Sequence, residues 1–184
     1  MPSDTSPDRY TRTAASLHWL VAFAIFGAFA LGLYMQDLPI SPAKLKLYSY
    51  HKWIGVAIFL LMLARLGWRL AHTPPPLPTG MPGWQHRAAK GLHHLLYALL
   101  FAIPLSGWLM SSAKGFQTVW FGVLPLPDLV GKDKALGDAL AAVHQTLNFT
   151  MAALVLIHIA AVVKHHALDG ERVLGRMLPW VREK

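Results

Sequence analysis

Four long apolar stretches constrain this chain more than any other feature of its sequence. They cover residues 14–35, 51–70, 92–113 and 139–163, and the only charged residues in them are three basic ones in the second stretch. A helix of about 20 residues spans the hydrocarbon core of a bilayer, which is about 30 Å thick. The connections between the stretches are too short to form a soluble catalytic domain. We therefore predict one all-α integral membrane domain over residues 1–184, a four-helix bundle in contact with lipid.

Composition supports this prediction and excludes several functions. Hydrophobic residues make up 54% of the chain and charged residues 14%, with a mean hydropathy of +0.39. The chain has no cysteine, which excludes disulfides, thiolate metal sites and iron–sulfur clusters. The net charge of +8 comes without any run of five basic residues, so we expect no nucleic-acid partner. The first apolar stretch is longer than the core of a usual signal peptide, and we interpret it as a retained span.

The basic residues predict how the bundle is oriented. If the N-terminus is inside, eleven of them flank the inner ends of the spans: Arg9, Arg12, Arg65, Arg69, Arg87, Lys90, Lys164, Arg172, Arg176, Arg182 and Lys184. Six flank the outer ends: Lys44, Lys46, Lys52, Lys114, Lys132 and Lys134. Because cytoplasmic connections are enriched in Lys and Arg, both termini are predicted to lie in the cytoplasm.

Histidines are the most informative polar residues. Six of the ten lie within or close to the ends of the spans: His18, His51, His93, His94, His144 and His158. An ionisable side chain at this depth is costly and indicates a functional site by default. The competing interpretation is that each histidine only forms a hydrogen bond with a neighbouring helix. So many histidines together favour a shared function.

Alternating helix directions sort four of these histidines into two levels. His51 and His144 are expected near the outer face, and His18 and His158 near the inner face. His144 and His158 are 14 residues apart, so they share one face of their helix at positions about 21 Å apart. Two histidines at one depth, from different helices, supply the two axial ligands of a six-coordinate haem iron.

Two alternatives remain open at this point. His93 or His94 could replace His18, because the third span also starts at the inner face. A zinc site is less favoured, because no acidic residue lies in the four stretches to complete its ligand set.

The order of short motifs along the chain resembles the bacterial cytochrome b561 family. The motifs are His18-Trp19, His51-Lys52-Trp53-Ile54-Gly55, Arg65 to Arg69, Leu95-Leu96-Tyr97, Pro104-Leu105-Ser106-Gly107-Trp108, and His144 with His158. Each motif alone is loose, but their order and spacing extend over all four spans. The resemblance implies a multi-pass protein of the bacterial inner membrane with two b-type haems. It also implies that His18, His51, His144 and His158 are the axial ligands of the haem iron, and that His93 is not.

The resemblance further implies an oxidoreductase that transfers electrons between a periplasmic redox partner and the quinone pool. One branch of the family oxidises superoxide and reduces ubiquinone, and we predict that this chain is such a superoxide oxidase. His165 matches a position near the quinone in that branch. The lysine that accompanies it there is replaced here around Thr79 and Gly80.

Charged side chains near the ends of the spans are candidates to bind the haem propionates. They are Lys52 outside and Arg12, Arg65 and Arg69 inside, although each could simply anchor its helix at the interface. The outer connections carry a net charge of about +2, which favours the approach of an anion such as superoxide. Two other functions stay open: a haem relay subunit between quinol and a protein partner, and a transporter or structural bundle without a cofactor.

Overall fold

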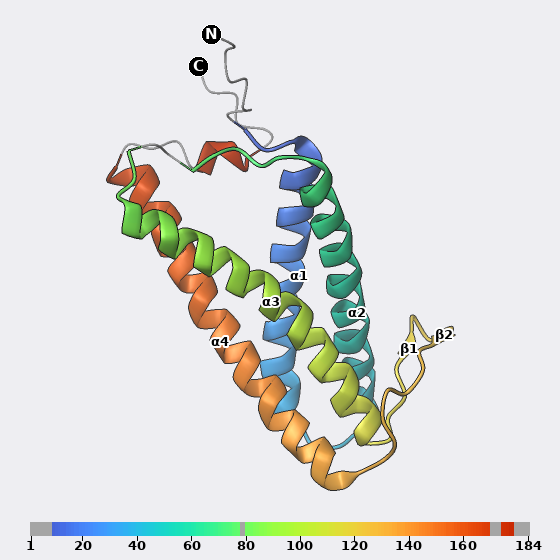
Figure 1. The fold of residues 1–184 in the computed structure, drawn as a ribbon. Coiled ribbons are helices and arrows are strands. Elements are labelled where there is room, and N and C mark those ends of the chain that lie inside the picture. The colour runs from blue at the N-terminus through green and yellow to red at the C-terminus, as the bar shows by residue number, and fades with distance from the viewer. Residues whose placement is uncertain (1–8, 78–79, 170–173, 179–184) are drawn as a thin grey trace.

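The computed structural model of the chain describes residues 9–77, 80–169 and 174–178. Four helices dominate it: α1 Arg12–Gln36, α2 Pro42–Ala71, α3 Gly83–Ala113 and α4 Lys134–Ala167 (Figure 1). Each is long and apolar enough to cross a membrane. The predicted all-α membrane bundle is thus confirmed. Of the basic residues used to predict the orientation, Arg172, Arg182 and Lys184 lie outside the described residues, and so does Thr79.

The helices extend beyond the apolar stretches that predicted them. Polar side chains cap three of the helix starts, because the hydroxyl groups of Thr11 and Ser41 and the carboxylate of Asp133 each accept a backbone N–H of the first turn. At α2, Pro42 occupies the first helical position, where its missing N–H costs nothing. The apolar stretches therefore mark the part of each helix that faces lipid, and the caps mark where the helix begins.

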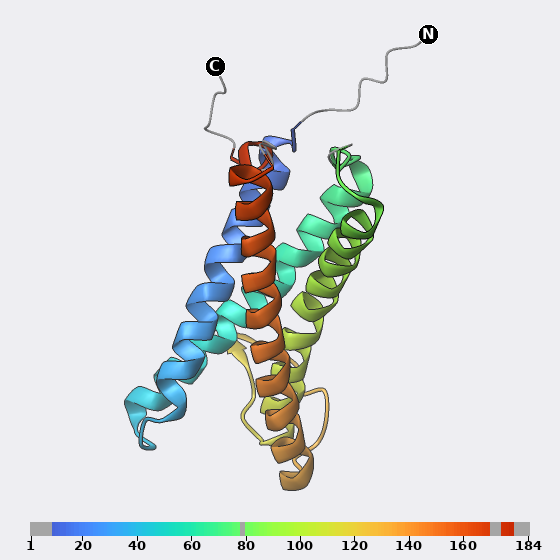
Figure 2. The same ribbon diagram turned by 90° about the vertical axis from the view of Figure 1, so that its left-hand side faces the viewer.

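The bundle consists of two helical hairpins. Helix α1 packs along α2 and helix α3 along α4, while α2 and α3 join the two hairpins (Figures 1 and 2). Val21, Ala28, Ile58 and Met62 form a buried cluster, in which Met62 is fully buried. Large apolar side chains such as Phe23 remain exposed on the outside of the bundle, as expected for a surface that faces lipid.

We name the two ends of the bundle outer and inner according to the predicted orientation. The outer end carries a small β-hairpin between α3 and α4. Strands β1 Val119–Trp120 and β2 Leu124–Pro125 pair antiparallel and project beside α2 (Figure 1). The indole of Trp53 donates to the carbonyl of Val119 at 2.7 Å, and the indole of Trp120 donates to the carbonyl of Trp53 at 3.2 Å. These two hydrogen bonds fix the hairpin to the start of the second apolar stretch.

At the inner end, segments that are distant in the sequence meet. The short 3-10 helix η1 Leu174–Arg176 follows α4, and the Arg176 guanidinium donates to the carbonyl of Pro76 at 2.7 Å. The amide of Tyr10 donates to the carbonyl of Arg176 at 3.3 Å, and the indole of Trp19 donates to the carbonyl of Met177 at 2.9 Å. We call this set of contacts the inner clasp.

Candidate functional site

The structure brings four histidines together as two pairs at different depths. The ring centroids of His51 and His144 are 6.2 Å apart, and those of His18 and His158 are 6.4 Å apart. Each pair joins α4 to the other hairpin. A first-row metal lies about 2 Å from an imidazole nitrogen, so two rings on opposite sides of one metal have centroids roughly 6 Å apart. Both separations therefore fit one six-coordinate iron between the rings.

The ring of His144 is held by α3. Its Nδ1 lies 2.9 Å from Ser106 Oγ and 3.1 Å from the Ile103 carbonyl oxygen, and Ser106 Oγ–H donates to that same carbonyl at 2.8 Å. Both neighbours of Nδ1 thus act as acceptors, which assigns the proton to Nδ1. The Nε2 atom keeps its lone pair, as a metal-binding histidine requires.

Two glycines allow the outer rings to approach the helix backbones. A Cβ atom at Gly107 would lie 3.0 Å from Cε1 of His144, and one at Gly32 would lie 3.5 Å from Cε1 of His51. Gly55 lies one turn after His51, and a Cβ atom there would meet nothing within 4 Å. The close contacts depend on how each helix is rotated, and sequence spacing alone does not specify that rotation.

A cavity of about 250 Å³ opens beside the outer pair. All four helices line it, mostly with apolar side chains that include Phe29 and Met151, and His51 and His144 form part of its wall. The Nδ1 atom of His51 is buried and makes no hydrogen bond of regular geometry with the described residues. An apolar cavity with two imidazoles in its wall suits a flat, largely apolar macrocycle that carries a metal.

A third ring lies close to the inner pair. The centroid of His93 is 5.4 Å from that of His158, whereas His94, the next residue on α3, is exposed. A separation of 5.4 Å is shorter than two rings on opposite sides of one metal would have, so the geometry favours His18 as the partner of His158. His93 therefore lies next to the inner pair without completing it.

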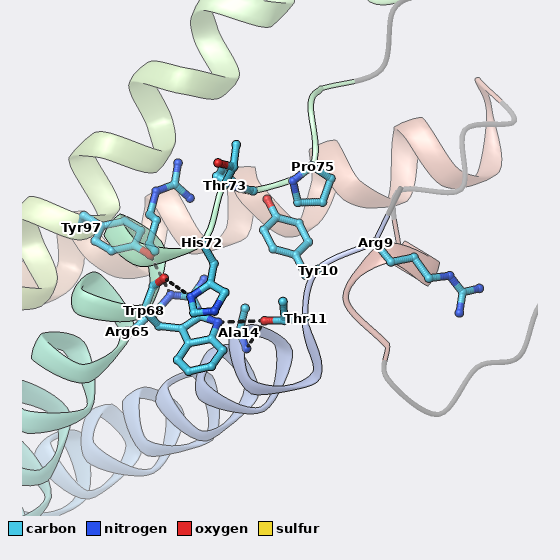
Figure 3. Close-up of a pocket in the computed structure, with 12 residues that line it drawn as sticks. Arg9, Tyr10, Thr11, Ala14, Arg65, Trp68, His72, Thr73, Pro75 and Tyr97 are labelled. Atoms are coloured by element: carbon cyan, nitrogen blue, oxygen red, sulfur yellow. Dashed lines mark hydrogen bonds between the residues drawn. The ribbon is translucent and has the colours of Figure 1, made fainter. Parts of the chain in front are cut away.

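Two arginines of α2 lie beside the Tyr97 ring at the inner end of the bundle, and Figure 3 shows Arg65 at that ring. The Nε of Arg65 donates to the Tyr97 hydroxyl at 2.9 Å, and the guanidinium carbons of Arg65 and Arg69 each lie 5.7 Å from the centre of the Tyr97 ring. The Nη1 atom of Arg65 is buried and has no hydrogen-bond partner among the described residues. A buried guanidinium donor of this kind suits a carboxylate, such as a haem propionate.

The other two predicted propionate partners lie differently. Arg12 is exposed at the start of α1 and is not among the residues that line the small pocket around Tyr97, where Arg9 and Thr11 are found instead (Figure 3). At the outer end, Lys52 donates from Nζ to the carbonyl of Phe116 at 2.9 Å. Its ammonium group is thereby held next to the outer connection.

His165 contacts the carboxylate of Asp169, which the pattern of histidines did not predict. Its Nδ1 is 2.8 Å from the Asp169 carboxylate, and Nζ of Lys164 is 2.6 Å from the same oxygen. The hydrogen bond from Lys164 holds the pKa of Asp169 below its usual value, so that the carboxylate is ionised at neutral pH. The i,i+4 spacing of His165 and Asp169 is the sequence signal that could have revealed the pair.

Comparisons with known proteins agree with the resemblance found in the motifs. A family described as prokaryotic cytochrome b561 matches residues 9–180. Cytochrome b561 homolog 2 of Escherichia coli (strain K12) is 36% identical over 180 residues, which cover 97% of this chain and 95% of the relative. Cytochrome b561 homolog 1 of the same organism is 27% identical, over 94% of this chain and 98% of the relative. The probable superoxide oxidase CybB of Yersinia pestis is 27% identical, over 93% of this chain and 96% of the relative.

Proposed function

The chain belongs to the prokaryotic cytochrome b561 family of haem-binding electron-transfer proteins in the bacterial inner membrane, and we propose that it transfers electrons from periplasmic superoxide to the ubiquinone pool. The observation that carries the proposal is the presence of two histidine pairs, at two depths, that join α4 to α1 and to α2. Together they provide two redox positions, one near each face of the membrane.

Each pair would hold one b-type haem. His51 and His144 would bind the outer iron, and His18 and His158 the inner one. Bound there, the two haems would supply reversible one-electron chemistry at a potential set by their surroundings. The chain would contribute the rest: the histidines would hold the iron, apolar side chains would keep water from the cavity, and cations would balance the propionates.

The propionate partners differ between the two ends. Arg65 carries the strongest support, because its buried Nη1 lacks a partner among the described residues. Arg69 also lies beside the Tyr97 ring, and Lys52 is the candidate at the outer end. Arg12 is exposed at the start of α1, and of the four cations it has the least support as a propionate partner.

Superoxide as the donor is supported by charge and by one relative. Lys44, Lys46 and Lys52 all lie at the outer end of α2, on the same helix as His51. A positive outer surface raises the rate at which an anion arrives. The Yersinia pestis relative bears the name probable superoxide oxidase. In the balanced reaction, two superoxide anions each lose one electron to become dioxygen, and one ubiquinone takes up two electrons and two protons to become ubiquinol.

We assign the quinone end to His165. The residue lies at the inner end of α4, in the last turn of the helix, and Asp169 orients its ring through Nδ1. Such an orienting carboxylate fixes which ring nitrogen points toward a bound ligand. The lysine that accompanies this histidine in the superoxide-oxidising branch is replaced here around Thr79 and Gly80, so the proposal for the quinone end rests on His165.

The proposal predicts two separable reactions in the purified, haem-loaded protein. Superoxide should reduce the haems quickly, and the rate should fall as salt is raised, because charge steering is screened over about 8 Å at physiological ionic strength. Added ubiquinone should then reoxidise the haems. His165→Ala should slow reoxidation by about tenfold or more, in line with the loss of a ligand-orienting contact, while reduction stays unchanged. Stopped-flow absorbance of the haem bands measures both steps.

The matched control is His166→Ala, which removes an exposed neighbouring histidine and should leave both steps unchanged. Superoxide dismutase should abolish the reduction. Reduction by superoxide no faster than that of an unrelated b-type cytochrome would reject the superoxide assignment and favour a relay between quinol and a protein partner. Equal slowing by both variants would remove His165 from the quinone site.

A further inference from the structure

Ser106 is a buried residue in the last third of α3, with 6% of its surface exposed. We propose that Ser106 is a positioning residue that acts through His144 and lowers the reduction potential of the outer haem. The inference rests on the proposed function, because it requires His144 to be an axial ligand. It adds a residue that sets how readily electrons leave the outer position.

The hydrogen bonds around Ser106 determine that His144 is the donor and Ser106 the acceptor. Its hydroxyl hydrogen is donated to the Ile103 carbonyl at 2.8 Å, so the hydroxyl oxygen can only accept from His144 Nδ1–H, at 2.9 Å. The Ile103 carbonyl is a second acceptor for the same N–H, at 3.1 Å. His144 thus donates one proton toward two acceptors, and its other nitrogen faces away from them.

An acceptor on Nδ1–H makes the imidazole a stronger electron donor at Nε2. A stronger donor stabilises the more highly charged, oxidised iron relative to the reduced iron, and the reduction potential falls. Gly107 supports the effect because its lack of a side chain lets the ring of His144 lie against α3. A lower outer potential favours the passage of electrons from the outer to the inner position.

The effect is confined to the outer site. In the part of the chain that the structure describes, no side-chain hydroxyl or carboxylate accepts from the rings of His18, His51 or His158. Removing the hydroxyl of Ser106 should therefore change one haem and leave the other as it was. This selectivity separates a positioning role from a general loosening of the bundle, which would disturb both sites.

The test is a spectroelectrochemical titration of the haem-loaded protein, with electron paramagnetic resonance to distinguish the two haems. Ser106→Ala should shift the midpoint potential of the outer haem upward and leave the inner one unchanged. Ser106→Thr keeps the hydroxyl, so the outer haem of this variant should have the wild-type midpoint potential. The matched control is Ser112→Ala, which removes another buried hydroxyl of α3, one that accepts from the amide of Leu129. It should shift neither potential.

Three results would overturn the inference: an outer potential unchanged in Ser106→Ala, an equal shift in Ser112→Ala, or a Ser106→Thr variant that behaves like Ser106→Ala. If Ser106→Ala releases the outer haem, recovery of that haem in Ser106→Thr supports the positioning role, and failure to recover refutes it. Absence of an outer haem from the wild-type protein would instead refute the proposed function. The two failures are therefore distinguishable in one set of spectra.

Discussion

Either histidine pair can be broken without touching the other, because the two pairs use different residues at different depths. Intact protein should bind two haems, and His51→Ala or His144→Ala should remove the outer one alone, so that the haem content falls by half. His18→Ala should remove the inner one. His93→Ala should keep both, because the His93 ring is too close to His158 to share an iron with it. Pyridine haemochrome quantification measures each outcome.

His94→Ala is the control for these substitutions, since it removes an exposed histidine of α3. Loss of a haem in His93→Ala with retention in His18→Ala would exchange the roles of these two residues. A wild-type content of one haem or none would contradict the pairing altogether.

At the scale of single residues, some contacts could be predicted from the sequence and others could not. The pairing of His51 with His144 could be predicted, because depth follows from position along a span. Depth alone leaves His93 and His94 as alternatives to His18, and the ring separations of the folded chain favour His18 as the partner of His158. The contact between Ser106 and His144 could not be predicted, because it depends on the rotation of α3 relative to α4. The same holds for Gly107: its motif was visible in the sequence, but its closeness to the ring was not.

At the scale of elements, the four helices could be predicted and the hairpin could not. The length of an apolar stretch can be compared with the thickness of the bilayer, and this comparison predicts a spanning helix. It does not predict the residues that cap the helix, such as Ser41 and Asp133. Strands β1 and β2 have two residues each, and the hydrogen bonds of Trp53 and Trp120 hold them in place. Contacts of this kind between distant residues leave no periodic pattern in a sequence.

The hairpin provides a prediction at this scale. Residues 116–127 contain no charged side chain, and Val123 is 81% exposed at the end that projects beside α2. We expect this tip to lie in the outer membrane interface, where aromatic and apolar side chains are favoured. Because the chain has no cysteine, a fluorophore on Val123→Cys labels one position only. Nitroxide lipids in the bilayer should quench it strongly.

The matched position is Gly131→Cys, in the outer connection beyond the hairpin, where aqueous iodide should be the better quencher. If iodide quenched the label on Val123→Cys as well as the label on Gly131→Cys, the tip would be in water and available to a periplasmic protein instead.

For the whole molecule, the main prediction concerns orientation. With eleven basic residues assigned inside and six outside, a reporter fused after Lys184 should remain in the cytoplasm. A reporter inserted near Lys132 should appear in the periplasm. Paired alkaline phosphatase and green fluorescent protein fusions measure both positions. The opposite result would place the lysines of α2 in the cytoplasm and the proposed donor in the wrong compartment.

The inner clasp has a consequence for how the protein is made. The Arg176 guanidinium donates to the carbonyl of Pro76, a hundred positions earlier in the chain, and the Arg176 carbonyl accepts from the amide of Tyr10. Synthesis from the N-terminus therefore delivers Tyr10 and Pro76 before Arg176, which follows α4. The inner clasp therefore cannot close until all four helices have been synthesised.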